Sequence, residues 1–250
     1  ITAQQAFVNY ALSGGSVVTV GRYVTMLGFE AKKPTGLFQS STAYDTRILE
    51  VDLDPNLIFE ALEGVKYTVA SDTMFFGISV GQTANKFVEE ETYDVVEVAA
   101  SLDLGGGFSI FAGGNFSERK ELNQEGLEHY NTYMTYETGA WLFAAELNAS
   151  NGTIAGFVGD NYVYSYLLMA NYEYSDVASV TARFSALDYT KLFTTDEVDE
   201  AEAYDIKKYT LAHNYAFSES LLLVTEVSHV DYSNFDATST QFAVELLFSF

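Results

Sequence analysis

Residues 240–250 alternate between apolar and mostly polar positions. One face of this segment is aromatic or aliphatic throughout, with Phe242, Val244, Leu246, Phe248 and Phe250. The opposite face is mostly polar, and its single large apolar residue is Leu247. A period of two residues is that of an extended strand, whose successive side chains point to opposite faces. The chain therefore ends in a β-strand with one apolar and one mostly polar face.

The same alternation recurs along the whole chain, with turn residues between the segments. It predicts strands at 3–12, 16–27, 63–70, 73–83, 92–104, 108–119, 129–138, 140–150, 161–175, 178–190, 204–218, 221–233 and 240–250. In the segment 161–175 one face is rich in tyrosine, whereas Ser165, Asn171 and Glu173 lie on the other. The alternation is less regular in 16–27, 129–138 and 221–233, so the facing of these strands stays open.

The connections between the predicted strands alternate between short and long. Tight turns lie at 13–15, 71–72, 105–107, 139, 175–176 and 218–220, and longer connections at 28–62, 84–91, 120–128, 151–160, 191–203 and 234–239. Outer-membrane barrels have short periplasmic turns and longer outer loops, whereas a soluble sandwich has no reason to keep such an alternation. The pattern predicts an all-β fold, an antiparallel transmembrane β-barrel of about fourteen to sixteen strands that forms a single domain over residues 1–250.

The alternation also predicts more strands than the segments above provide. If the last strand ends in the periplasm, the first predicted strand begins on the outer side of the membrane. Bacterial single-chain barrels have an even number of strands, and the pattern gives about thirteen. We therefore expect one or more N-terminal strands before Ile1, or a strand hidden at 47–53.

The connection 28–62 is too long for an ordinary hairpin loop, and loops of this length are usually functional. Within it, Asp54-Pro55-Asn56 precedes the apolar run 57–64, which ends at Gly64. This order predicts a short helix. Such a loop either folds inward and constricts the bore or caps the barrel from outside, and the sequence leaves both readings open.

The composition agrees with a barrel that faces lipid on one side and water on the other. Apolar residues make up 48% and charged residues 19%, with a mean hydropathy of +0.03, and no apolar run is long enough for a transmembrane helix. The 18 tyrosines, against one tryptophan, suit interfacial aromatic belts, although packing between two sheets is an alternative. The candidate belt residues are Tyr162, Tyr164, Tyr172, Tyr174, Tyr209 and Tyr215.

Charge and cysteine usage exclude several classes of function. A net charge of −23 argues against nucleic acid as a partner, since a polyphosphate requires a basic surface. The absence of cysteine excludes disulfides, thiolate metal sites and cysteine nucleophiles. The acidic stretches 89–91 and 196–202 either attract cations to a pore mouth or simply keep loops solvated, and their spacing does not fit an EF-hand. We expect no metal and no cofactor.

Three stretches resemble a known family. QQAFVNY (4–10), GRYVTMLGFE (21–30) and EGVKYTV (63–69) are similar to segments of the outer-membrane β-barrel porins of the OmpL-like, beta-barrel porin-2 type. The resemblance covers the first third of the chain, and it implies a water-filled pore for small solutes. The chain differs from that family in being short and in lacking the strands expected before Gln4.

Charges on the inward faces of the strands are the candidate functional residues, because rings of side chains set ion selectivity in channels. The predicted pore-lining residues are Lys66, Glu97, Asp103, Arg119, Glu146, Glu173, Arg183, Lys208 and Glu245. The predicted residues of a constriction loop are Arg22, Arg47, Glu50, Asp52, Asp54, Glu60 and Glu63. Their acidic excess favours a mild cation preference. In the alternative reading, these residues only fill a polar lumen and pair with one another.

Catalysis has little support in the sequence. The chain holds three histidines, of which only His129, beside Glu128 at a loop edge, has a suggestive position. None of the common hydrolase, metalloprotease or phosphate-binding motifs is present. We expect that the protein is not an enzyme.

Together these patterns predict a porin in the outer membrane of a Gram-negative cell envelope. It would allow passive diffusion of small hydrophilic solutes or ions, with outer-membrane lipid and lipopolysaccharide around it. A homo-oligomer or a larger envelope complex is a candidate assembly. The alternative is a non-conducting barrel that acts as an adhesin, an envelope anchor or a subunit of a larger complex.

Overall fold

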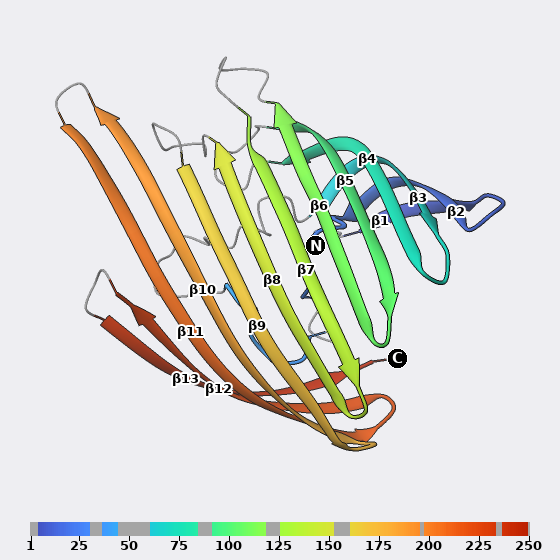
Figure 1. The fold of residues 1–250 in the computed structure, drawn as a ribbon, viewed down its shortest axis with the longest axis vertical. Helices are drawn as coiled ribbons and strands as arrows, with labels where there is room; N and C mark the ends of the chain where they lie inside the picture. The colour runs from blue at the N-terminus through green and yellow to red at the C-terminus, as the bar shows by residue number, and fades with distance from the viewer. Residues whose placement is uncertain are drawn as a thin grey trace.

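The computed structural model describes residues 5–30, 37–44, 61–84, 92–118, 126–152, 161–195, 198–233 and 237–249. Thirteen strands in these ranges form one antiparallel sheet, in which each strand pairs with its neighbours in sequence (Figure 1). The strands are β1 (Ala6–Ala11), β2 (Ser16–Val24), β3 (Ala61–Ala70), β4 (Met74–Ala84), β5 (Thr92–Gly105), β6 (Phe108–Glu118), β7 (Glu128–Thr138), β8 (Trp141–Gly152), β9 (Asn161–Ser175), β10 (Ala178–Thr195), β11 (Val198–Ser218), β12 (Leu221–Tyr232) and β13 (Ala237–Phe248).

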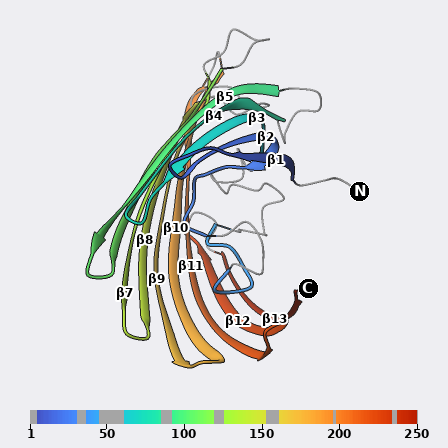
Figure 2. The same cartoon turned by 90° about the vertical axis from the view of Figure 1, so that its right-hand side faces the viewer.

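The sheet is strongly curved, and its strands surround a concave side (Figure 2). β1 and β13 form its two edges and do not pair with each other in the described residues. Each of the thirteen predicted segments overlaps one strand. The predicted all-β, antiparallel barrel fold is confirmed, and the sandwich alternative is not, because all described strands belong to a single sheet.

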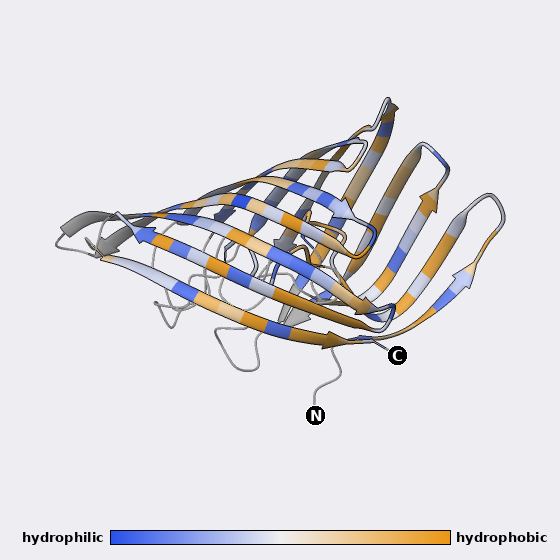
Figure 3. Cartoon of the chain, turned by 90° about the horizontal axis from the view of Figure 1, so that it is seen from below, coloured by the Kyte–Doolittle hydropathy of each residue, from blue (hydrophilic) through white to orange (hydrophobic). Residues whose placement is uncertain are grey.

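The two faces of the sheet differ as the alternation predicted. On the convex, outer face Phe242 is 82% exposed and Val244 76% exposed. On the concave, inner face, residues such as Glu97, Asn131 and Thr181 are buried. Apolar and polar positions alternate along the strands in Figure 3. The side chains that would meet hydrocarbon therefore lie outside, and polar side chains lie inside.

Aromatic side chains gather toward both ends of the strands on the outer face. Near the tight turns, Phe108 stacks on Tyr136 with ring centroids 4.0 Å apart, and Trp141 stacks on Tyr172 at 4.4 Å. Five of the six predicted belt tyrosines are exposed: Tyr164, Tyr172, Tyr174, Tyr209 and Tyr215. This placement matches the aromatic belts of membrane barrels and not a buried layer between two sheets.

The prediction of a long connection at 191–203 is wrong. β10 continues to Thr195 and β11 begins at Val198, so only residues 196–197 connect them. The antiparallel register runs without interruption from the turn at 176–177 to the pair Thr195 and Val198. Residues 189–195 are rich in tyrosine, threonine and phenylalanine, which favour strands, and this explains the extension.

The predicted helix at 57–64 is also wrong for its described part, because Ala61 to Gly64 belong to β3. Leu62 is fully buried and packs with Tyr23, Val95 and Leu127, which a continued strand makes possible. A Cβ atom on Gly64 would lie 2.2 Å from the carbonyl oxygen of Val80. The glycine therefore permits a close approach of two strands and does not end a helix.

None of the described residues forms a helix long and apolar enough to cross a membrane. The alternative position of an additional strand, 47–53, lies outside the described residues.

Candidate functional site

The connection after β2 enters the concave side of the sheet at once. Its first loop segment, residues 25–30, begins beside Glu97 of β5. The hydroxyl of Thr25 donates a hydrogen bond to Glu97, and the backbone N–H of Met26 donates to Glu97 Oε1 at 2.8 Å. Glu97 is fully buried. A buried carboxylate requires such donors, and here the loop supplies them.

The first loop segment then crosses β7 and β8. The N–H of Gly28 donates to Asn131 Oδ1 at 3.1 Å, and the N–H of Phe29 donates to Glu146 Oε1 at 2.7 Å. Asn131 Nδ2 donates to the same Glu146 oxygen at 2.7 Å. Because irregular backbone forms no hydrogen-bond ladder of its own, its N–H groups need other acceptors. Side chains on the inner face of the sheet, here called the inner wall, provide them.

Two glycines make room for this segment on the wall. A Cβ atom on Gly77 would lie 2.4 Å from Met26 Sδ, and one on Gly113 would lie 2.5 Å from Leu27 Cδ2. Glycine inside a strand often marks a close approach by another backbone or side chain. These glycines could therefore indicate the loop contact from the sequence. The strand pattern alone makes no use of them.

The second loop segment, residues 37–44, lies on the inner face of β10–β12 (Figure 2). Its contacts with β10 and β11 are made mainly through carbonyl groups. Phe38 O accepts hydrogen bonds from Asn214 Nδ2 at 2.8 Å and from Thr181 Oγ1 at 3.3 Å. Ala43 O accepts one from Ser185 Oγ at 2.6 Å. β10 and β11 thus present hydrogen-bond donors to this segment.

Arg183 of β10 joins the two loop segments. Its guanidinium forms an ion pair with Glu30 of the first segment. It also donates to Ser41 O at 2.9 Å and to Thr42 O at 3.0 Å in the second segment. Lys208 Nζ donates to the same Thr42 carbonyl at 2.9 Å. The Arg183 side chain has no exposed surface, so its charge is committed to these partners.

Glu226 of β12 completes the contacts of the second segment. Its carboxylate accepts from the N–H of Ser41 at 2.9 Å and from the Ser41 hydroxyl at 2.5 Å. Neither Glu226 nor Glu30 was among the predicted site residues. Glu226 was missed because the alternation in 221–233 did not fix its facing, and Glu30 because no strand period applies to a loop.

Part of the inner wall is apolar. Beneath the second segment, Tyr44 packs in a buried cluster that includes Leu167, Leu187 and Ile206. The Tyr44 hydroxyl also donates to Glu146 Oε2 at 3.2 Å. The loop therefore covers a hydrophobic area of β9–β12 that would otherwise face the lumen.

The structure brings four of the predicted pore-lining residues together beneath the loop: Glu97, Glu146, Arg183 and Lys208. Lys66 also lies on the inner face, with Nζ 4.6 Å from the ring centroid of Tyr23. Glu245 is half-buried on the inner phase of β13. Asp103 and Glu173 are exposed beside tight turns, away from the level of the loop.

Six of the predicted residues lie outside the described residues: Arg47, Glu50, Asp52, Asp54, Glu60 and Arg119. Arg22 and Glu63 are not loop residues, contrary to the prediction. They lie in β2 and β3 as direct cross-strand neighbours, and Arg22 Nη1 is 3.0 Å from Glu63 Oε1. They share the strand phase of the exposed Val20 and Val65, so the pair is on the outer face.

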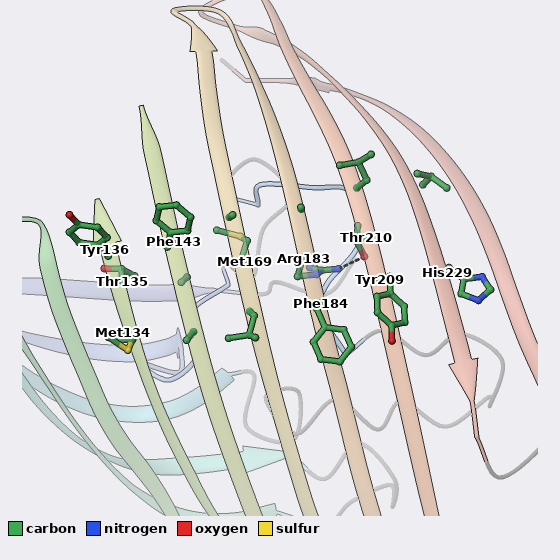
Figure 4. Close-up of a pocket in the computed structure, with 17 residues that line it drawn as sticks. Met134, Thr135, Tyr136, Phe143, Met169, Arg183, Phe184, Tyr209, Thr210 and His229 are labelled. Atoms are coloured by element: carbon green, nitrogen blue, oxygen red, sulfur yellow. Dashed lines mark hydrogen bonds between the residues drawn. The ribbon is translucent and has the colours of Figure 1, made fainter. Parts of the chain in front are cut away.

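A groove on the outer face lies on the opposite side of the wall from the second loop segment. Its floor includes Ala170 and Ala182, and its rim includes Phe143, Phe184 and Tyr209. Figure 4 shows Phe184 and Tyr209 beside each other, together with the hydrogen bond between Arg183 and Thr210. The rim residues belong to the outward phase of their strands, so this groove faces the lipid side and is no path for a polar solute.

The histidines lie in three different surroundings. His129 is buried, and its Nδ1 is 2.7 Å from Ser150 Oγ. His213 contacts the Tyr174 hydroxyl and His229 contacts Thr240, both on the outer phase of their strands. That the protein is not an enzyme stays a prediction.

Comparison with known proteins identifies the class of fold. No protein-family model matches the chain, and no curated protein matches it. Solved structures do. A loop-deletion mutant of OmpT, an outer membrane protein of Vibrio cholerae, superimposes with a TM-score of 0.68 at 13% identity, over 97% of this chain and 78% of that one.

An anion-selective porin from Comamonas acidovorans gives a TM-score of 0.65 at 12% identity, over 96% of this chain and 75% of that one. A further porin gives 0.61 at 15% identity, over 96% and 80%. At these identities the likeness concerns the fold alone. The chain has the fold of outer-membrane β-barrel proteins, porins among them, which agrees with the predicted location in the outer membrane. The OmpL-like type stays a prediction.

Proposed function

We propose that this chain is a porin of the OmpL-like type, which allows small hydrophilic solutes or ions to diffuse through a bacterial outer membrane. The observation that carries the proposal is the opposite character of the two faces. Exposed apolar residues such as Phe242 and Leu168 cover the outside, while Asn131, Asn148 and Ser165 are on the inside. A closed barrel of this kind encloses a polar lumen.

The loop contacts support a narrowed bore. Both described loop segments lie against the inner wall, between β5 and β12, and not above the rim of the sheet. Loop backbone within the lumen occupies space that solutes would otherwise use. The bore would therefore be narrowest at the level of Glu97, Glu146 and Arg183.

A mild cation preference is the finer part of the proposal. It rests on the net charge of −23, because a negative potential concentrates cations at a channel mouth. One of the similar structures is described as an anion-selective porin, so the fold by itself does not fix the sign of the preference. One similar structure is described as a trimer form, which supports a homo-oligomer for this chain as well.

Conductance across a planar lipid bilayer tests the proposal. Purified, refolded protein should give ohmic current steps in potassium chloride. Under a salt gradient, the reversal potential should have the sign of cation preference. The absence of current steps from protein that is folded in the membrane contradicts a diffusion channel, and a reversal potential of the opposite sign contradicts the cation preference.

The apolar cluster beneath the second loop segment favours one alternative, a non-conducting barrel that anchors or assembles with other envelope components. Tyr44, Leu187 and Val230 pack on the inner face of the sheet in a buried apolar cluster, which a wide water channel does not require. In this case the bilayer experiment gives no current, and the role lies in the outer surface or in the loops. Catalysis forms no part of either proposal.

A further inference from the structure

Two loop segments that are separated in sequence meet at one wall residue. Arg183 contacts Glu30 of the first segment and the carbonyls of Ser41 and Thr42 in the second. Within the loop, Glu30 also accepts hydrogen bonds from Gln39 Nε2 at 3.0 Å and from the N–H of Ala43 at 2.7 Å. Arg183 and Glu30 therefore form a clasp that closes the loop on itself and fixes it to β10.

The three wall carboxylates beneath the loop make the same kind of contact. Each accepts one backbone N–H and one hydroxyl hydrogen bond from the loop. Glu97 receives those of Met26 and Thr25, and Glu226 receives both from Ser41. Glu146 receives the N–H of Phe29 and the hydroxyl of Tyr44. Charge-assisted hydrogen bonds of this kind are about twice as strong as neutral ones.

The charged residues of the inner wall that contact the loop are buried. Glu97 is 0% exposed, Glu146 2% and Arg183 3%. A charge that is desolvated and surrounded by loop donors or acceptors is not available to replace the hydration shell of a passing solute. Their chemistry fits attachment of the loop better than contact with a permeating ion.

We propose that Arg183 is the positioning residue of the loop, and that Glu97, Glu146, Glu226 and Lys208 act with it as loop anchors and not as solute contacts. The clasp sets where the loop lies and so sets the bore. Its effect on conduction rests on the proposed diffusion channel, whereas the position of the loop does not. Solutes would instead meet the less buried charges Glu173 and Glu245.

Thiol labelling tests the position of the loop without any need for conduction. Because the chain has no cysteine, Ala43→Cys introduces a single thiol at a position that is 3% exposed, beside Ser185. A membrane-impermeant maleimide should label this thiol severalfold more slowly than the thiol of Asp176→Cys, in the exposed turn between β9 and β10. Addition of Arg183→Met should raise the labelling rate of Ala43→Cys severalfold.

Arg22→Met is the matched control, because Arg22 forms an ion pair on the outer face. It should leave the labelling rate of Ala43→Cys unchanged. If Arg183→Met does not give folded barrel, Glu30→Gln replaces it, since it weakens the same clasp and leaves the strand untouched. A labelling rate in Arg183→Met, or in this replacement, that equals the wild-type rate overturns the proposal. So does rapid labelling of Ala43→Cys in the wild-type background.

Bilayer recordings separate this proposal from the proposed function. If the wild-type barrel conducts, Arg183→Met should increase the single-channel conductance and the current noise, whereas Arg22→Met should change neither. If the wild-type barrel does not conduct but Arg183→Met frees the Ala43→Cys thiol, the diffusion channel is contradicted and the clasp is supported. A conducting barrel whose conductance is the same in Arg183→Met contradicts the claim that the clasp sets the bore, and leaves the diffusion channel supported.

Discussion

The backbones of the two loop segments contact mainly different halves of the inner wall. The first segment, residues 25–30, offers N–H groups to Glu97, Asn131 and Glu146, which are acceptors on β5, β7 and β8. The second segment, residues 37–44, offers mainly carbonyl groups to donors on β10 and β11, among them Arg183 and Lys208. Acidic side chains of the inner wall thus contact backbone N–H groups, and basic side chains contact backbone carbonyl groups. Loop backbone that forms no hydrogen-bond ladder of its own needs such partners.

The two halves of the inner wall also differ in how much apolar surface they bury against the loop. Beneath the second segment the wall adds a hydrophobic cluster with Tyr44 and Leu187, and the clasp to Glu30 lies there as well. Beneath the first segment, tight packing depends on the missing side chains of Gly77 and Gly113. We therefore expect the second half to bear most of the loop's attachment, and the following substitutions test this difference.

The largest effect is expected for Arg183→Met. Removing one partner of a buried ion pair leaves an uncompensated charge and costs roughly 3–5 kcal/mol of folding free energy. Here Glu30 and two loop carbonyls lose their donor. Urea unfolding in lipid vesicles, followed by the fluorescence of the single tryptophan, Trp141, measures the change.

Arg22→Met provides the control for this measurement. Its ion pair with Glu63 is on the surface, where such pairs contribute at most about 1 kcal/mol. The double variant Glu30→Gln with Arg183→Met should recover part of the loss, because it removes the charge that was left unpaired. Equal losses in Arg183→Met and Arg22→Met would contradict the special role of the second half.

The sequence predicted the strands and the faces wherever alternation was regular. In 92–104 and 140–150 it placed Glu97 and Glu146 on the inner face, where they lie. In β12 the consecutive residues Leu221, Leu222 and Leu223 hide the phase, so Glu226 was not assigned. In β2 the alternation is too irregular to fix the facing of Arg22, which was predicted in the constriction loop and lies on the outer face of the strand.

What the sequence could not show was the partner of each inward charge. Phe29 and Glu146 are 117 residues apart in sequence, and Ser41 and Glu226 are 185 apart. The alternation of apolar and polar residues along a strand gives no information on such a contact, because the contact depends on where the loop lies once the sheet has curved. Gly77 and Gly113 were the only local signals among the described contacts, since glycine within a regular strand indicates close packing.

A smaller effect is expected in the first half, from Gly113→Val. The Cβ atom of the new side chain would lie 2.5 Å from Leu27 Cδ2 and 2.8 Å from the carbonyl oxygen of Val98, and overpacking of this kind costs about 1–3 kcal/mol. Urea unfolding measures the loss. Labelling of Ala43→Cys should stay slow, because Arg183 also holds the second segment directly, through the carbonyl groups of Ser41 and Thr42. Gly114→Val, on the outer phase of the same strand, should cost less, and rapid labelling of Ala43→Cys in Gly113→Val would show that the two segments move as one unit.

The smallest change in stability is expected for a charge that the loop does not cover. Glu173→Gln, at an exposed position beside the turn 176–177, should lie within about 0.5 kcal/mol of the wild type. In a conducting barrel it should nevertheless move the reversal potential away from cation preference, since a solvated carboxylate acts on passing ions.

Glu146→Gln should cost more stability than Glu173→Gln and shift the reversal potential less. The expected loss is about 1 kcal/mol, because charge-assisted hydrogen bonds from Phe29 and Asn131 become neutral ones. A larger shift of the reversal potential for Glu146→Gln than for Glu173→Gln would mean that the covered charge still faces the permeating ion, and that the loop does not shield it.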